Sequence, residues 1–145
     1  MEDIGRIVEK LENYRIVTNR MLSLLNKIHD FIVAIMRDAN IEEVETDKLI
    51  VRRSTYSAYD LRFTVKSLAE SGYLPSDTQR LSYEGYWAGD FNKPFRNLSR
   101  EGVLEVAKNI DGVFIKLVEE VDRYTKDASE QVKKLQKIVE VIRST

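Results

Sequence analysis

Few side chains in this sequence could carry covalent or acid–base chemistry. His29 is the single histidine, and the chain has no cysteine. A histidine that acts as a base or a metal ligand needs a carboxylate to orient it or a second ligand. Asp30 is adjacent in sequence, about 100° around a helix, which makes it a poor orienting group. We therefore expect His29 to be a partly buried residue on the flank of a helix.

The motifs that mark common enzyme classes are also missing. The sequence has no glycine-rich phosphate loop, no G-x-S-x-G turn and no cluster of metal-ligand residues. One small class of helical nucleases pairs an arginine with a histidine a few residues later, but Arg20 lies nine residues before His29. We predict a protein that is not an enzyme and that holds neither a metal ion nor a cofactor.

Charge gives a clearer signal than catalytic groups. Five acids fall within ten residues without a base, namely Asp38, Glu42, Glu43, Glu45 and Asp47. One interpretation is a solvated turn between two helices. The other is a surface presented to a basic partner, such as one that normally holds nucleic acid.

Two further groups are candidates for partner binding. Six of the thirteen aromatic residues fall between residues 73 and 95, where Tyr86 and Trp87 could anchor a partner beside Arg96. The same aromatics could instead cap the end of a helical core. Lys133, Lys134 and Lys137 form a basic group near the C-terminus, which is also what an exposed helix end favours.

Direct nucleic-acid binding is not favoured by the overall charge. Residues 48–100 carry nine bases and five acids. Domains that bind nucleic acid usually have an isoelectric point above about 9, whereas this chain has a value near 5.9.

Two long helical stripes dominate the pattern of apolar residues. The first repeats in steps of three and four through Ile4, Ile7, Leu11, Tyr14, Thr18, Met21, Leu25, Ile28, Ile32 and Ile35. The second runs through Val103, Ala107, Ile110, Phe114, Leu117, Val121, Tyr124, Ala128, Gln131, Leu135, Ile138 and Ile142. Ser99 is expected to cap the second helix, and Gly112 within it suggests a close backbone approach.

A third helix is expected between these two. Ser54, Ala58, Leu61, Val65 and Leu68 repeat the helical spacing. Thr46 or Asp47 would cap its start, and Gly72 with Pro75 would end it. Ser76 with Gln79 then predicts a short fourth helix.

The predicted fold is all-α: an antiparallel bundle of three long helices and a short one, with coiled-coil-like terminal helices. Residues 1–145 would form one domain, with the C-terminal helix projecting from about residue 125. An obligate dimer through the long stripes is the main alternative, because the spacing supports both. Hydrophobic residues make up 43% and charged residues 32%, which excludes a disordered chain. Neither a membrane span nor a secretory signal is expected.

A resemblance supplies a more specific function. The segment 95–104, followed by Ala107 and Lys108, resembles a small family from archaeal two-tailed viruses, and Ile28 to Ala39 is a weaker echo. That family includes a virion structural protein and a related inhibitor of the host RNA polymerase, whose fold is a helical bundle. The length, the absence of cysteine and the near-neutral charge are more similar to the inhibitor.

The resemblance implies a viral protein in the cytoplasm of an infected archaeal cell. It would bind in the DNA-binding channel of the host RNA polymerase, block template loading and restrain the clamp, so that initiation and elongation fail. Competition with basal initiation factors would follow, and no small-molecule substrate or membrane is implied. The alternatives are a self-associating or virion structural protein and a nucleic-acid-binding regulator.

Overall fold

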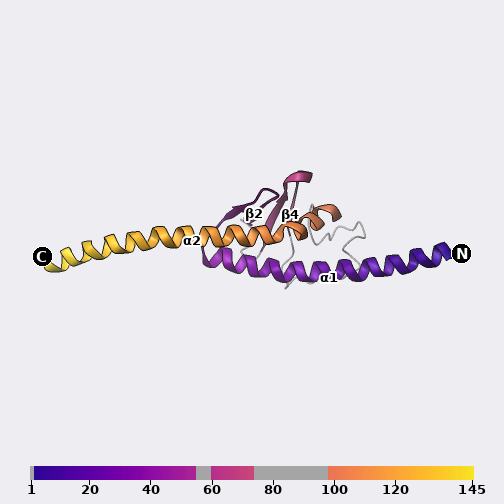
Figure 1. Cartoon of the computed structure of the whole chain (residues 1–145), viewed down its shortest axis with the longest axis horizontal. Coiled ribbons are helices and arrows are strands. Elements are labelled where there is room, and N and C mark those ends of the chain that lie inside the picture. The colour runs from indigo at the N-terminus through magenta and orange to yellow at the C-terminus, as the bar shows by residue number, and fades with distance from the viewer. Residues whose placement is uncertain (1, 55–59, 74–97) are drawn as a thin grey trace.

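The computed structural model describes residues 2–54, 60–73 and 98–145, and it contains two long helices and a small sheet (Figure 1). The elements in chain order are α1 (Glu2–Asp38), β1 (Glu43–Glu45), β2 (Leu49–Arg53), β3 (Leu61–Val65), a 3₁₀ turn η1 (Lys66–Leu68), β4 (Glu70–Tyr73) and α2 (Arg100–Ser144).

The predicted all-α helical bundle is wrong, because the middle of the chain forms strands. Leu61, Phe63 and Val65 are buried and alternate with more exposed residues along β3, which is the period of two expected for a half-buried strand. Leu61 and Val65 also stand four apart, so the same residues fit a helical stripe. The β-branched and aromatic residues of β2 and β3 favour the strand.

The predicted start and end of the third helix are replaced by turn and strand structure. The Thr46 hydroxyl accepts from the Leu49 amide at 2.9 Å and from the Lys48 amide at 3.2 Å, which closes the β1–β2 turn. Gly72 lies in β4, paired with Phe63 in β3. Pro75 and the predicted short helix at Ser76–Gln79 lie outside the described residues.

The four strands form an antiparallel sheet in the order β1-β2-β3-β4. One row of neighbours crosses the whole sheet, from Val44 through Val51 and Phe63 to Gly72, and all four are buried. This face of the sheet supplies much of the core, while Arg52 and Arg62 point to the exposed face. An antiparallel sheet with one dry face needs a cover.

The N-terminal part of α2 provides that cover. It packs against β1, β2 and β3, and its buried side chains follow helical spacing through Val103, Val106, Ile110, Val113 and Leu117. The C-terminal half of α1 packs beside it and buries Leu25, Ile32 and Met36. The core therefore lies where the sheet and both helices meet.

The two helices run parallel to each other, not antiparallel. The Tyr14 hydroxyl near the start of α1 accepts a hydrogen bond at 3.3 Å from Arg100 at the start of α2. Further along both helices, the rings of Phe31 and Phe114 lie 6.1 Å apart. The predicted antiparallel bundle had a third long helix between the two terminal helices, whereas the described part of that segment forms the sheet.

Both helix ends that border the sheet have well-defined caps. At the end of α1, Asn40 adopts a left-handed backbone conformation (φ 55°), and the Ile41 amide donates to the Met36 carbonyl at 2.8 Å. At the start of α2, the Ser99 hydroxyl accepts from the Gly102 amide at 3.0 Å and donates to the Glu70 carboxylate at 2.8 Å. The prediction of Ser99 as the N-cap is confirmed, and Glu70 ties this cap to β4.

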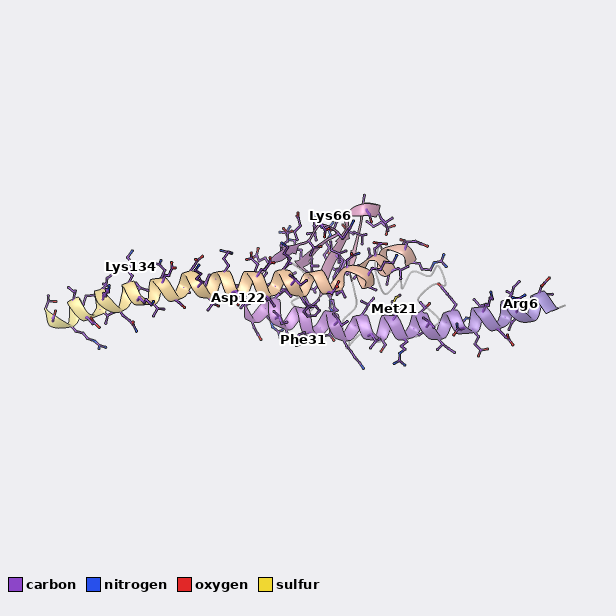
Figure 2. The ribbon with its side chains drawn as sticks, viewed as in Figure 1. Arg6, Met21, Phe31, Lys66, Asp122 and Lys134 are labelled. Atoms are coloured by element: carbon purple, nitrogen blue, oxygen red, sulfur yellow. The ribbon has the colours of Figure 1, made fainter. Side chains whose placement is uncertain are left out.

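The staggered helices extend beyond the core at both ends of the molecule (Figures 1 and 2). On α1, residues 3–13 are exposed all round. On α2, residues 121–145 are exposed except for Ala128, which is half-buried. Figure 2 shows α2 continuing alone from near Asp122 past Lys134, beyond the end of α1.

The two glycines of α2 give opposite predictions. A Cβ on Gly112 would meet only a methyl of Thr46, at 3.8 Å, so the close backbone approach expected there is not present. Gly112→Ala should therefore raise the free energy of unfolding by up to about 1 kcal/mol. A Cβ on Gly102 would come within 2.5 Å of the Glu70 carboxylate, so Gly102→Ala should displace Glu70 from the Ser99 hydroxyl and lower stability by about 1 kcal/mol.

Urea unfolding of the two variants beside the unchanged protein measures both effects. Equal shifts in the same direction would contradict the difference in packing at the two sites.

Candidate interaction surface

The five acidic residues singled out in the sequence gather at one end of the core. Asp38 ends α1, and the other four follow along β1 and its turn. All five are exposed, namely Asp38, Glu42, Glu43, Glu45 and Asp47. We call this group the acidic edge.

The fold partly neutralises the acidic edge. Lys66, 21 residues further along, donates to the Glu45 carboxylate at 3.0 Å and to the Thr46 carbonyl at 2.7 Å. Arg52 stands directly opposite Glu43 across the β1–β2 pair. The acidic edge therefore carries less net charge than the sequence segment alone.

Among the described residues, the three C-terminal lysines predicted to bind a partner do not join the acidic edge. Lys133, Lys134 and Lys137 are exposed on the projecting part of α2, with Lys134 far from Lys66 in Figure 2. Tyr86, Trp87 and Arg96, proposed as an aromatic anchor, lie outside the described residues.

His29 is a core residue that links α1 to the sheet. Its side chain is fully buried, its Nε2 accepts from the Leu61 amide at 3.1 Å, and its ring lies 6.5 Å from that of Phe63. The sequence predicts only partial burial of His29, whereas the side chain is fully buried. Nδ1 lies 3.0 Å from an Asp30 carboxylate oxygen, so Asp30 does contact the ring, contrary to expectation. Both ring nitrogens are engaged within the fold, which leaves neither for catalysis.

Burial lowers the pKa of His29 below its ordinary value of 6.5, and this effect outweighs the nearby carboxylates of Asp30 and Asp60, which raise it. The neutral imidazole is the form that can accept the Leu61 amide hydrogen. The histidine thus fixes α1 on β3 in its uncharged state.

Other kinds of site find little support in the described parts of the chain. Within residues 2–54, 60–73 and 98–145, no group of three or more histidine, cysteine, aspartate or glutamate residues could hold a metal ion. None of the helices described has both the length and the apolar character that crossing a membrane requires.

Among the described residues, the projecting part of α2 exposes an apolar face. Nine large hydrophobic residues beyond Leu117 are exposed, from Val121 at 39% to Tyr124 at 71%. They are Val118, Val121, Tyr124, Val132, Leu135, Ile138, Val139, Val141 and Ile142. Contiguous apolar surface of this kind marks an interaction site. We call the residues at 121, 124, 128, 131, 135, 138 and 142 the α2 stripe.

Charged side chains border the α2 stripe. Arg123 donates to the Glu120 carboxylate at 2.9 Å, and its other terminal nitrogen lies 3.7 Å from Asp127. The hydrogen bond from Arg123 lowers the pKa of Glu120. Both carboxylates are exposed, so the network keeps charge beside the stripe and contributes little stability by itself.

The spacing in the sequence predicts the α2 stripe as part of a seam that pairs with the first helix of the same chain, and it predicts that the C-terminal helix projects from about residue 125. In the structure α2 is buried only as far as Leu117, and from near Asp122 it continues past the end of α1 (Figure 2). The mismatch in length between the two stripes is the signal for this projection.

The described part of the viral resemblance is structural. Leu98, Ser99 and Gly102 belong to the buried start and cap of α2 against β4. Comparisons with protein-family models, with curated proteins and with solved structures find no match to this chain. The observed fold also differs from the helical bundle that the resemblance implies.

His29 generates a prediction about pH. In the unfolded chain the His29 side chain has its ordinary pKa of 6.5, whereas burial lowers its pKa in the folded protein. As the pH falls from 7 to 5, His29 therefore takes up a proton in the unfolded chain at a higher pH than in the folded protein. The free energy of unfolding should therefore decrease over this range. His29→Gln keeps an acceptor for the Leu61 amide and should remove this part of the pH dependence.

His29→Leu provides the matched comparison, because it leaves the buried Leu61 amide unpaired at a cost of about 1–3 kcal/mol. Urea unfolding at pH 5, 6 and 7 measures all three proteins. The assignment fails if the unchanged protein and His29→Gln lose stability equally between pH 7 and pH 5.

Proposed function

We propose that this protein is a non-catalytic interaction protein whose projecting helix α2 pairs with another amphipathic helix. The observation that carries the proposal is the exposed α2 stripe, which continues the helical spacing of the core helix for more than three turns without a cover. Pairing of an apolar helix face with a second helix is a common mode of protein recognition.

The physical state of the projection supports this function. A helix segment that makes no tertiary contacts draws little stability from its own backbone, and most helical stability in proteins comes from packing an apolar face. Residues 121–144 remain one continuous helix with the core. A partner that covers the α2 stripe would supply the missing packing energy.

The proposal predicts where a partner contacts the chain. A photo-crosslinking amino acid at Leu135, in the α2 stripe, should give a discrete crosslinked product in cells that naturally make the protein. The matched control places the same amino acid at Lys126 on the opposite, polar side of α2. Equal crosslinking at both positions, or none at Leu135, would contradict the proposal.

A second function rests on the acidic edge. We propose, as the alternative, a viral inhibitor that binds the basic DNA-binding channel of host archaeal RNA polymerase, in the cytoplasm of the infected cell. The supporting observation is that Asp38, Glu42, Glu43, Glu45 and Asp47 are all exposed at one end of the core. Complementary charge would then steer binding, although Lys66 and Arg52 reduce the charge available.

The alternative is tested by transcription in vitro with purified archaeal RNA polymerase. Inhibition should weaken as salt rises, and the triple variant Glu42→Lys, Glu43→Lys and Glu45→Lys should abolish it. The control variant Glu119→Lys, Glu130→Lys and Glu140→Lys makes the same change in charge on exposed positions of α2 and should still inhibit. Equal inhibition by both variants would remove the acidic edge from the mechanism.

A further inference from the structure

We infer that the helix that covers the α2 stripe is the same segment of a second copy of this chain, running antiparallel to the first. This inference rests on the proposed function, because it names the partner of the same surface. It follows from the arrangement of charged and apolar residues on the two sides of the stripe.

The spacing of the α2 stripe is that of a helix-pairing heptad. Val121, Ala128 and Leu135 alternate with Tyr124, Gln131 and Ile138 in steps of three and four. Five of these six are exposed, and Ala128 is half-buried. Asp122, next to the first residue of the stripe, lies near the level where α1 ends (Figure 2), so a second helix can take the position beside α2 that α1 occupies within the core.

The two flanks of the stripe differ in character. The flank that follows Leu117, Tyr124, Gln131 and Ile138 carries no charge: its residues are Val118, Thr125, Val132 and Val139. The flank that precedes Val121, Ala128, Leu135 and Ile142 carries three charged residues, Glu120, Asp127 and Lys134, and ends in Val141. We call these the apolar flank and the charged flank.

This asymmetry selects the antiparallel orientation. In a parallel pair, the charged flank of each helix lies against the apolar flank of the other, which would set Asp127 against Val132 and Lys134 against Val139 of the second copy. In an antiparallel pair, like flanks meet. The valines of the apolar flank then pack together, and the charged residues lie together at the solvent-exposed side.

Charge also fixes the register. With Ala128 opposite Gln131 of the second copy, Tyr124 faces Leu135 and Val121 faces Ile138. Asp127 then lies near Lys134 of the other chain, and the two-fold symmetry makes this attraction twice. Sliding the helices by one heptad in one direction brings Lys134 against Lys134. Sliding them in the other direction brings Asp127 against Asp127, with Glu120 near Lys134 on both sides of that contact. Both neighbouring registers therefore contain a like-charge contact that this register lacks.

The centre of the pair supports the same register. Ala128 is the smallest residue of the stripe and Gln131 is its one polar member besides the Tyr124 hydroxyl. A small residue opposite a longer polar one at the two-fold axis leaves room for the amide. A single polar layer in an otherwise apolar seam specifies alignment.

A charge exchange tests the contact. In Asp127→Lys alone, two lysines face each other twice, and in Lys134→Glu alone, aspartate faces glutamate twice. Each variant alone should raise the dissociation constant of the dimer about tenfold. Mixed together, the two variants form a heterodimer with both attractive pairs restored, so the mixture should dimerise nearly as tightly as the unchanged protein in sedimentation equilibrium.

Disulfide trapping tests the orientation, because the natural chain has no cysteine. Val121→Cys and Ile138→Cys lie opposite each other in the antiparallel pair. Within either variant alone, the two copies of the same cysteine are about 26 Å apart along the axis. Mild oxidation should therefore crosslink the mixture of the two variants and neither variant by itself. Crosslinking of each variant alone would establish a parallel pair and overturn the inference.

The outcomes separate the inference from the proposed function. A protein that stays monomeric at about 100 micromolar refutes self-pairing. If Leu135 still crosslinks to a different protein in cells, the proposed function stands with another partner. If Leu135 gives no crosslink and the purified protein is also monomeric, both fail. Circular dichroism of every variant confirms that α2 remains helical.

Discussion

The dry face of the sheet constrains the rest of the structure. Four short antiparallel strands bury one row of side chains centred on Phe63, and such a sheet is not stable until a helix covers it. The stretch of α2 from Val103 to Leu117 provides this cover. Glu70 fixes where α2 begins on β4 through Ser99, and His29 fixes α1 on β3 through the Leu61 amide. Each of these two polar contacts therefore sets the position of a long helix on a small sheet.

The sequence predicts the terminal helices well and the middle of the chain poorly. Long stripes with a period near 3.5 residues identify α1 and α2, and the hydroxyl of Ser99 marks where α2 begins. The segment around Leu61 and Val65 fits both a helix and a strand over so short a length. What decides in favour of the strand is hydrogen-bonded pairing with β2 and β4 on either side, which the spacing of apolar residues within one segment does not reveal. Thr46 was predicted to cap a helix but closes the β1–β2 turn, because a threonine hydroxyl can accept from backbone amides in either structure.

The relative direction of α1 and α2 could not be predicted from the spacing of residues within each helix. This direction determines that the α2 stripe is exposed. Antiparallel helices of similar length would have covered the α2 stripe within one chain. Parallel, staggered helices leave it exposed beyond Leu117 and leave Ile4, Ile7 and Leu11 exposed at the opposite end. Of the residues first considered for partner binding, the acidic edge and the three lysines are exposed on separate parts of the chain. The apolar stripe on the projecting part of α2 is the main candidate for function.

The continuity of α2 has a mechanical consequence. The same uninterrupted helix carries Val113 and Leu117 in the core and Leu135 and Ile142 in the projection. From Leu117 to Ile142 the helix extends about 38 Å, and it contains neither proline nor glycine over that length. A force or a rotation applied at the far end is therefore transmitted along a stiff helix to the core cluster that contains Val113, Leu117 and Phe63. A partner bound to the projecting part of α2 is therefore mechanically coupled to the sheet, although it does not contact the sheet.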